Sequence, residues 1–140
     1  MTAKQFLSRG RWIEREISAL MKTRDETRDR LTHITQNYDS DGAQSTKDPH
    51  KFDTLLELED KLDGMIDKLY QTKNEILDAI EKLEDSRERI ALRVYYVDMK
   101  TWEEVAVALH YSWRQTMYIR KSALKNFEKL CIELHIGGVV

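Results

Sequence analysis

Residues that break helices or form cross-links are scarce in this chain. Its 140 residues include one proline (Pro49), one cysteine (Cys131) and five glycines. A single cysteine excludes an internal disulfide and suits a reducing compartment. With so little proline and glycine, helices can run far without interruption. The composition therefore favours long helices in a protein of the cytoplasm.

Long apolar runs are also missing. No window approaches 18 uncharged apolar residues, and the N-terminal "MTAKQFLSRGRW" lacks the apolar core of a signal peptide. Hydrophobic residues make up 41% of the chain, enough for a core, and charged residues make up 34%. We therefore expect a soluble protein with no membrane partner.

Motifs for catalysis are absent from the sequence. It contains no nucleophile elbow, no Walker loop and no dinucleotide-binding loop. Its carboxylates follow solvated helix faces, with no apolar pocket to raise a pKa. Cys131 and His135 are four residues apart and could share a metal, but they have no further ligands nearby, and a packed thiol is the simpler reading. The sequence predicts no enzyme, no small-molecule substrate, no cofactor and no metal site.

The net charge of −2 hides a strong segregation of charge. Residues 1–38 carry eight Lys/Arg against five Asp/Glu, and residues 86–140 carry nine against six. Residues 39–85 reverse this balance, with six Lys/Arg against fourteen Asp/Glu. An acidic middle segment is thus flanked by two basic ones, which can attract it.

Two heptad patterns predict a helical hairpin. The first has the seam residues Phe6, Gly10, Ile13, Ile17, Leu20, Arg24, Thr27, Leu31, Ile34 and Tyr38. The second has Phe52, Leu55, Glu59, Leu62, Ile66, Leu69, Lys73, Ile76, Ile80 and Leu83. We expect helices over about residues 3–38 and 51–85, joined by the turn-rich linker 39–50. A short linker and opposite charges favour antiparallel packing, with Ile13 and Ile17 near Lys73 and Leu77.

Additional apolar residues beside the second seam widen its stripe: Leu56, Leu58, Met65 and Leu77. This breadth predicts that the second helix packs on more than one neighbour. Residues 1–85 are the first expected domain, a coiled-coil-like hairpin, and residues 86–140 the second.

The second domain reads as three helices separated by short breaks. "SRERIALRVYYV" predicts a helix that "DMK" ends. Thr101 with Glu104, and Ser112 with Gln115, each have the spacing of a capping box at the start of a helix. The last helix should run to about Leu134. Two capped helices on either side of a three-residue turn are typical of a helix-turn-helix, which makes the expected fold all-α.

The two faces of the last helix differ in character. The helical period places Thr116, Ile119, Ala123 and Phe127 on the inner face, opposite small Ala106 of the preceding helix. The outer face carries a stripe of three cations and one tyrosine: Arg114, Tyr118, Lys121 and Lys125. Arginine can read guanine, and lysine neutralises phosphates, so the stripe suits DNA, although basic stripes are often only solvated faces. By the same criterion Gln115 can be only a cap, and Trp113 can pack on Tyr95 and Tyr96.

"LRVYYVDMKTWEEVAVALHYSWRQTMYIRKSALKNFEKL" resembles the helix-turn-helix of sigma factor region 4. The matching positions are Leu92, Tyr96, Thr101, Glu104, Val105, Ala106, Leu109, Ser112, Ile119, Ala123, Leu124 and Phe127. The chain as a whole is similar to small phage and prophage proteins of Gram-positive bacteria related to the RinA and ArpU late transcriptional regulators. No counterpart of the sigma region that reads the −10 element is evident in residues 1–85.

This resemblance implies a DNA site at the start of the last helix. Trp113, Arg114 and Met117 correspond to promoter-reading positions, and Trp113 and Met117 depart from the Arg or Glu common there, which implies an altered recognition site. With the stripe, the base-edge candidates are Trp113, Arg114, Gln115, Met117 and Tyr118. The phosphate candidates are Lys100, Thr101, Lys121 and Lys125.

The function expected from the sequence is therefore that of a phage-encoded, sequence-specific transcriptional regulator. Its expected partners are double-stranded DNA, RNA polymerase of the bacterial host and a second copy of the chain. The alternative is a helical interaction or assembly protein, such as a terminase-like packaging component or a polymerase inhibitor. Salt-dependent binding to duplex DNA separates the two hypotheses.

Overall fold

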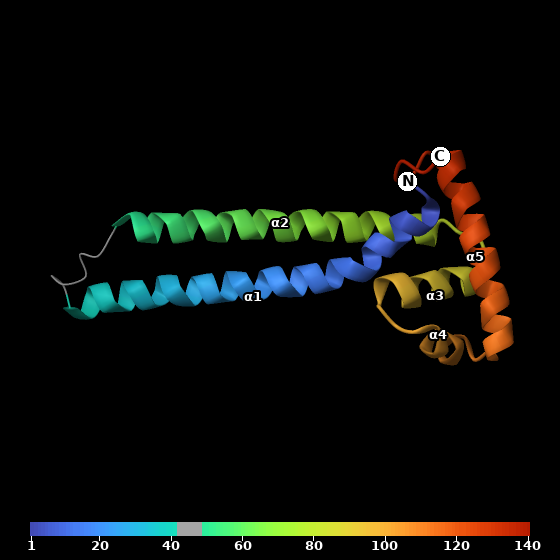
Figure 1. The fold of residues 1–140 in the computed structure, drawn as a ribbon, viewed down its shortest axis with the longest axis horizontal. Coiled ribbons are helices and arrows are strands. Elements are labelled where there is room, and N and C mark those ends of the chain that lie inside the picture. The colour runs from blue at the N-terminus through green and yellow to red at the C-terminus, as the bar shows by residue number, and fades with distance from the viewer. Residues whose placement is uncertain (42–48) are drawn as a thin grey trace. The chain divides into compact units, whose positions relative to one another are not determined.

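Two long helices account for the first part of the chain (Figure 1). The computed structural model describes the backbone of residues 1–41 and 49–140, and the side chains of these residues except 35–41 and 49. Helix α1 spans Ala3–Asp41 and α2 spans Pro49–Glu81. A capping box starts α1: the Gln5 amide donates to Thr2 Oγ1 (3.1 Å) and the Thr2 amide to Gln5 Oε1 (2.8 Å). Proline is well tolerated in the first turn of a helix, where α2 has Pro49.

The remaining helices are shorter. They are α3 (Ser86–Leu92), the π-helix η2 (Arg93–Val97), α4 (Trp102–Leu109) and α5 (Trp113–Leu134). The described residues contain no β-strand, so the predicted all-α fold is confirmed. In the described part of the chain, no helix combines the length and apolar character that crossing a membrane requires.

The helix boundaries differ from the expected ones at two places. The second helix ends at Glu81 rather than near residue 85, because Asp85 caps the next helix by accepting from the Arg87 amide. Arg89 donates to the carbonyls of Leu83 (2.5 Å) and Glu84 (2.9 Å), which stabilises this connection. At the other end, α1 reaches Asp41, three residues beyond the expected bound. The rest of the expected linker, residues 42–48, lies outside the described residues.

The contacts between residues divide the chain into two compact units. One consists of residues 1–15 and 71–140 and is called the core unit here; the other consists of residues 16–70 and is called the hairpin unit. The expected boundary near residue 85 follows the change of sequence pattern, whereas these units cut across both long helices. The first turns of α1 and the last turns of α2 are thus grouped with the helix-turn-helix.

The hairpin unit is a pair of antiparallel helical segments. Its predicted seams point inward: Ile17, Leu31, Leu55, Leu62 and Ile66 are all buried. Ion pairs join the basic helix to the acidic one, with Arg24 at 3.2 Å from Asp63 and Arg28 bonded to Glu59. The hydrogen bond from Arg28 to Glu59 raises the pKa of its guanidinium. The predicted seam and charge pairing are both found in this unit.

The broad apolar stripe of α2 has no second neighbour in the hairpin unit. Leu56, Leu58 and Met65 are 37–42% exposed, so the prediction that this helix packs on several neighbours is wrong for this segment. The seam residues alone are enough to cover one partner helix. The flanking apolar residues are left at the surface.

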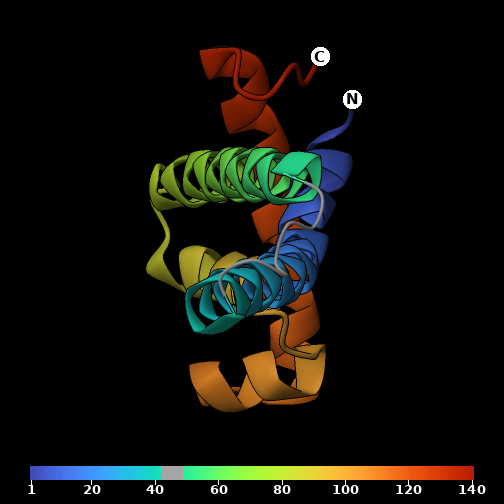
Figure 2. The same ribbon diagram turned by 90° about the vertical axis from the view of Figure 1, so that its left-hand side faces the viewer.

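The core unit buries large side chains from both ends of the chain. Phe6 of α1 stacks on Phe127 of α5 with ring centroids 6.2 Å apart, and both rings are almost fully buried. Lys73 of α2 bonds Glu14 of α1, next to Ile13, in agreement with the predicted antiparallel register. Figures 1 and 2 both place the two termini close together. Contacts between residues distant in sequence therefore hold this unit together.

Candidate nucleic-acid interface

Helices α4 and α5 form the predicted helix-turn-helix. In Figure 1, α4 is viewed almost along its axis while α5 runs from the bottom to the top of the picture, so the two helices cross steeply. His110 ends α4 in the left-handed conformation (φ 57°), and the Tyr111 amide donates to Ala106 O at 3.0 Å. The chain then reverses within three residues and enters α5 at Ser112. Ala106, at the predicted crossing, is buried.

Both predicted capping boxes are present. Thr101 Oγ1 accepts from the Glu104 amide at 3.2 Å, and Glu104 Oε2 accepts from the Thr101 amide at 2.9 Å. At the start of α5, Ser112 Oγ accepts from the Gln115 amide at 3.2 Å, and Gln115 Oε1 accepts from the Ser112 amide at 3.1 Å. These bonds satisfy amides that a helix start otherwise leaves without partners, and they fix where each helix begins.

A small apolar cluster holds α3, α4 and α5 together. Its buried members are Ala91, Trp102, Val105, Leu109 and Ile119. Trp102 stacks on Tyr95 with ring centroids 4.4 Å apart, and the guanidinium of Arg120 lies 4.9 Å from the Trp102 ring. Trp102 thus takes the place on the tyrosines that the sequence also allowed for Trp113.

The inner face of α5 is as predicted. Thr116, Ala123 and Phe127 have no exposed surface, and Ile119 is buried. Thr116 Oγ1 donates to Ser112 O at 2.8 Å, so its hydroxyl is satisfied within the helix. The outer stripe of Arg114, Tyr118, Lys121 and Lys125 is exposed along its whole length. Among the described residues, none of its three cations has an ion-pair partner.

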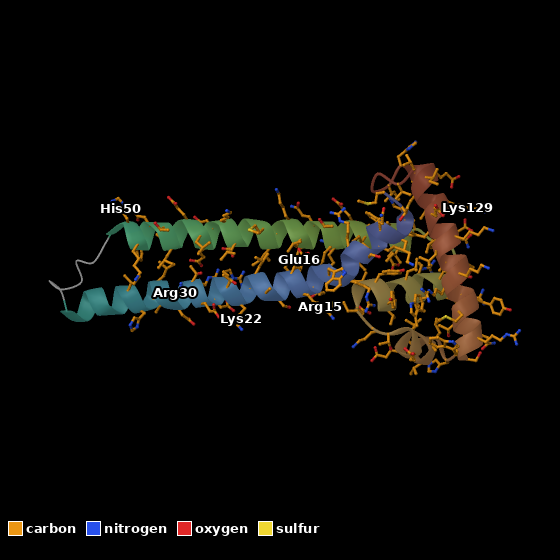
Figure 3. All side chains as sticks on the ribbon, viewed as in Figure 1. Arg15, Glu16, Lys22, Arg30, His50 and Lys129 are labelled. Atoms are coloured by element: carbon orange, nitrogen blue, oxygen red, sulfur yellow. The ribbon has the colours of Figure 1, made fainter. Side chains whose placement is uncertain are left out.

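Lys129 extends this stripe, although the sequence analysis did not select it as a site residue. It lies four residues after Lys125, is exposed, and points away from the neighbouring helices (Figure 3). The four-residue spacing of Lys121, Lys125 and Lys129 was the signal that could have identified it. The stripe therefore spans about four turns of α5.

The base-edge candidates fall into two groups. Trp113 and Tyr118 are 51% and 64% exposed, and Arg114 is exposed with them. Met117 is half-buried and packs against the apolar cluster, and the oxygen of the Gln115 side chain belongs to the cap. The structure thus exposes Trp113, Arg114, Gln115 and Tyr118, although the Gln115 oxygen is engaged in the cap, and it packs Met117 against the cluster.

The phosphate candidates before α4 stand in a mixed electrostatic environment. Lys100 and Thr101 are exposed, but the Thr101 hydroxyl is engaged in the capping box. Glu103 and Glu104 place two carboxylates in the first turn of α4. These charges oppose the attraction of the helix dipole for a phosphate. Attraction for an anion is stronger along the α5 stripe, which has no acid in it.

Arg11 of α1 supports the segment before α4 and was missed by the sequence analysis. Its Nη1 donates to the carbonyls of Tyr95 (2.7 Å) and Lys100 (2.9 Å), and its guanidinium lies 4.1 Å from the Tyr95 ring centroid. The wide turn of η2 and the positive φ of Met99 (60°) bring these carbonyls together. No local sequence pattern reveals such a contact, because the partners are more than eighty residues apart.

Gly10 lets α1 approach this segment closely. A Cβ atom at Gly10 would lie 2.9 Å from the Tyr96 carbonyl oxygen, nearer than side chains normally come. Glycine at this seam position is therefore a packing requirement rather than a weak point of the heptad pattern. Together, Gly10 and Arg11 join α1 to the helix-turn-helix.

Glu88, Cys131 and Tyr96 are buried titratable groups of the core unit, and burial raises the pKa of the Tyr96 hydroxyl. Glu88 of α3 is 3% exposed, and it accepts from Ser122 Oγ and from Asn126 Nδ2, each at 2.8 Å, which ties α3 to α5. Burial raises the pKa of the Cys131 thiol to about 11, so the thiolate is scarce at neutral pH. No group of three or more potential metal ligands occurs within the described residues.

Comparisons of the chain with protein-family models, with curated proteins and with solved structures found no match.

Proposed function

We propose that the chain is a sequence-specific DNA-binding transcriptional regulator that places α5 in the major groove. The observation that carries the proposal is the exposed stripe of Arg114, Tyr118, Lys121 and Lys125, on the second helix of a doubly capped helix-turn-helix. Its cations have no ion-pair partner among the described residues, so they are available to phosphates and base edges.

The residues have different roles in this proposal. Arg114 and Tyr118, near the start of α5, reach base edges together with Trp113. Lys121, Lys125 and Lys129 follow the phosphate backbone along the same helix. Lys100 and Thr101 make a weaker phosphate contact, because Glu103 and Glu104 lie beside them.

The resemblance to sigma factor region 4 and to late phage regulators supports the finer parts of the proposal. It favours a phage-encoded protein acting in the bacterial cytoplasm, with a contact to the host RNA polymerase.

Reversing the charge of the stripe tests the proposal. Arg114→Glu combined with Lys121→Glu should abolish DNA binding and leave the fold intact, because both side chains are exposed. Affinity is measured for selected and random duplexes at several salt concentrations, with circular dichroism to follow folding. The matched control is Lys22→Glu with Lys51→Glu, which makes the same change of charge at two other exposed sites. A folded stripe variant that binds DNA as the control does would refute the proposal.

Single substitutions distinguish residues that recognise bases from residues that contact phosphates. Arg114→Ala should cost about 1–3 kcal/mol and relax the preference at one base pair. Lys125→Ala or Lys129→Ala should weaken binding to all sequences alike and lower the salt slope by about one unit. If Arg114→Ala also weakens all sequences equally, Arg114 is a phosphate contact.

The alternative is a helical interaction or assembly protein. Exposed Trp113 and Tyr118 favour it, because large aromatic residues often anchor protein interfaces. Under this alternative, Trp113→Ala removes a contact with the protein partner and does not change the affinity for DNA. A wild-type chain that shows no salt-dependent binding to any duplex would favour this alternative.

A further inference from the structure

The outer face of the first turns of α1 forms a shallow basic depression in the core unit. It has a volume of about 390 Å³ and is lined by Thr2, Lys4, Gln5, Ser8, Arg9 and Trp12. Trp12 is 58% exposed, and the guanidinium of Arg15, a residue labelled in Figure 3, lies 4.9 Å from its ring. We call Lys4, Arg9, Trp12 and Arg15 the basic groove.

The polar lining of the basic groove is satisfied within α1. Thr2 and Gln5 bond each other in the capping box, and Ser8 Oγ donates to Lys4 O at 2.7 Å. What is left without a partner among the described residues is the charge of Lys4 and Arg9. Beside them lies the indole of Trp12, which is 58% exposed although the Arg15 guanidinium lies over its ring, and exposed apolar surface of this kind is costly to leave in water. The groove therefore favours an occupant with both acidic and apolar side chains.

A surface of that composition lies on α2 in the hairpin unit. At 100° per residue, one side of the helix carries Asp53, Leu56, Asp60, Asp67 and Tyr70, which we call the acidic stripe. Leu56 and Tyr70 are 39% and 40% exposed, and the three aspartates are exposed and have no ion-pair partner among the described residues. The helical period places no lysine or arginine on this side of α2 between residues 50 and 70.

We infer that the basic groove of one copy binds the acidic stripe of a second copy, so that the chain self-associates through reciprocal groove-to-stripe contacts. Asp60 and Asp67 neutralise Arg9 and Arg15, while Leu56 and Tyr70 cover Trp12. Charge complementarity sets the register, and burial of the indole supplies most of the affinity. DNA is the weaker choice of occupant for the groove, because phosphates neutralise the cations without covering the tryptophan.

The inference goes beyond the proposed function and does not require it. If the chain does bind DNA, a pair of copies would supply two recognition helices, as helix-turn-helix dimers do. Each contact is small compared with a stable interface, so we expect association to be reversible, concentration-dependent and weakened by salt.

Sedimentation equilibrium of the full chain without DNA is the test, run from low micromolar to submillimolar concentration at low and high salt. The wild type should dimerise. Trp12→Ala should raise the dissociation constant roughly thirtyfold, as expected for the central aromatic of an interface. Arg9→Glu with Arg15→Glu, and separately Asp60→Lys with Asp67→Lys, should each give monomers. The pair Lys22→Glu with Lys51→Glu serves as control and should dimerise like the wild type.

Mixing the two charge-reversed variants gives the sharpest result. The groove variant keeps an intact acidic stripe, and the acidic-stripe variant keeps an intact basic groove. The mixture should therefore associate, although neither variant does so alone. A groove that contacts the same groove of its partner would instead leave the Asp60→Lys/Asp67→Lys variant, whose groove is intact, dimeric on its own. Circular dichroism follows folding. The two variants alter different units, so if the basic-groove variant misfolds, the acidic-stripe variant alone still tests the inference.

Three outcomes would overturn the inference. They are a wild type that stays monomeric at low salt, a folded groove variant that dimerises like the control, and a mixture that remains monomeric while its components are folded. A monomeric wild type whose groove variant loses DNA affinity would assign the groove to nucleic acid instead. None of these results depends on whether the α5 stripe binds DNA.

Discussion

The same heptad pattern of α1 packs in two different ways in the two units. In the core unit its seam residues Phe6 and Gly10 meet aromatic side chains and backbone from α5 and η2. In the hairpin unit the seam continues with Arg24 and Thr27. Arg24 Nη1 donates to Asp63 while its buried Nε has no hydrogen-bond partner among the described residues, and the Thr27 hydroxyl donates to the helix's own Thr23 carbonyl. A heptad repeat thus determines which side of a helix is buried, whereas the side chains at the seam positions determine how closely the neighbouring element packs.

The largest expected effect comes from separating the units. Residues 86–140 alone should not fold, because Phe127 and η2 lose their partners on α1. A chain in which residues 16–70 are replaced by a Gly/Ser link of about six residues should fold, since Glu14 and Lys73 are already in contact. Circular dichroism and thermal melting of the two truncated chains check this. A folded 86–140 fragment would show that the core unit does not need α1.

One substitution made in both units compares their packing directly. Gly10→Ala should destabilise the protein by about 1–3 kcal/mol, since the new Cβ would overlap the Tyr96 carbonyl. Gly64→Ala should stabilise it by about 1 kcal/mol, because nothing lies within 4 Å of that position and alanine is the better helix former. Urea denaturation measures both. Equal effects of the two substitutions would contradict the close approach of α1 to η2.

Replacing a buried polar side chain should also change the free energy of unfolding by different amounts in the two units. Glu88→Ala leaves the Asn126 amide without its acceptor, although the Ser122 hydroxyl keeps the Ile119 carbonyl at 3.2 Å, and should cost about 2 kcal/mol. Arg24→Leu in the hairpin unit should be neutral or slightly stabilising, because it fills a seam position and Asp63 retains Arg28 at 3.8 Å. Denaturant midpoints of the two variants test this ranking, and a larger loss for Arg24→Leu would reverse it.

The smallest expected effect is on the pH dependence of stability below neutrality. A hydrogen bond from the Arg87 side chain holds the pKa of Asp85 below its usual value. A lowered folded-state pKa gives stability that is present above the unfolded pKa of about 4 and is lost as pH falls through the folded value. Asp85→Asn keeps the cap but loses the charge, so its deficit against wild type should be constant near neutrality and should shrink as pH falls below about 4 through the lowered folded-state pKa. A deficit that grows on acidification would contradict this sign.

Periodic features of the fold were predictable from sequence, and contacts between distant residues were not. The seams, both capping boxes and the inner face of α5 follow from spacing along one helix, and the structure confirms them. The grouping of Phe6 with Phe127, the two bonds of Arg11 and the burial of Glu88 depend on which helix lies opposite, which periodicity does not specify. The end of α2 was misplaced because Asp85 starts a new helix within an unbroken apolar pattern.

The candidate site shows the same limit. Spacing alone identified the exposed stripe of α5, and its cations are where the period places them. It allowed Trp113 to pack on the tyrosines and did not identify Trp102, which stacks on Tyr95 of η2, because both tryptophans begin a capped helix and their packing partners lie on another element. Whether the stripe binds DNA stays a prediction that the charge-reversal experiment tests.

The contacts of Arg11 and Phe6 also order the events of synthesis on the ribosome. The ion pairs of the hairpin unit join residues 31 and 39 positions apart, so that unit can form early on the growing chain. Arg11 must wait for Lys100, 89 positions later, and Phe6 must wait for Phe127. Until then the apolar side chains of the first turns of α1, such as Phe6 and Leu7, are without the cover they have in the folded chain. The helix-turn-helix, the part proposed to read DNA, is therefore the last part of the chain to become competent.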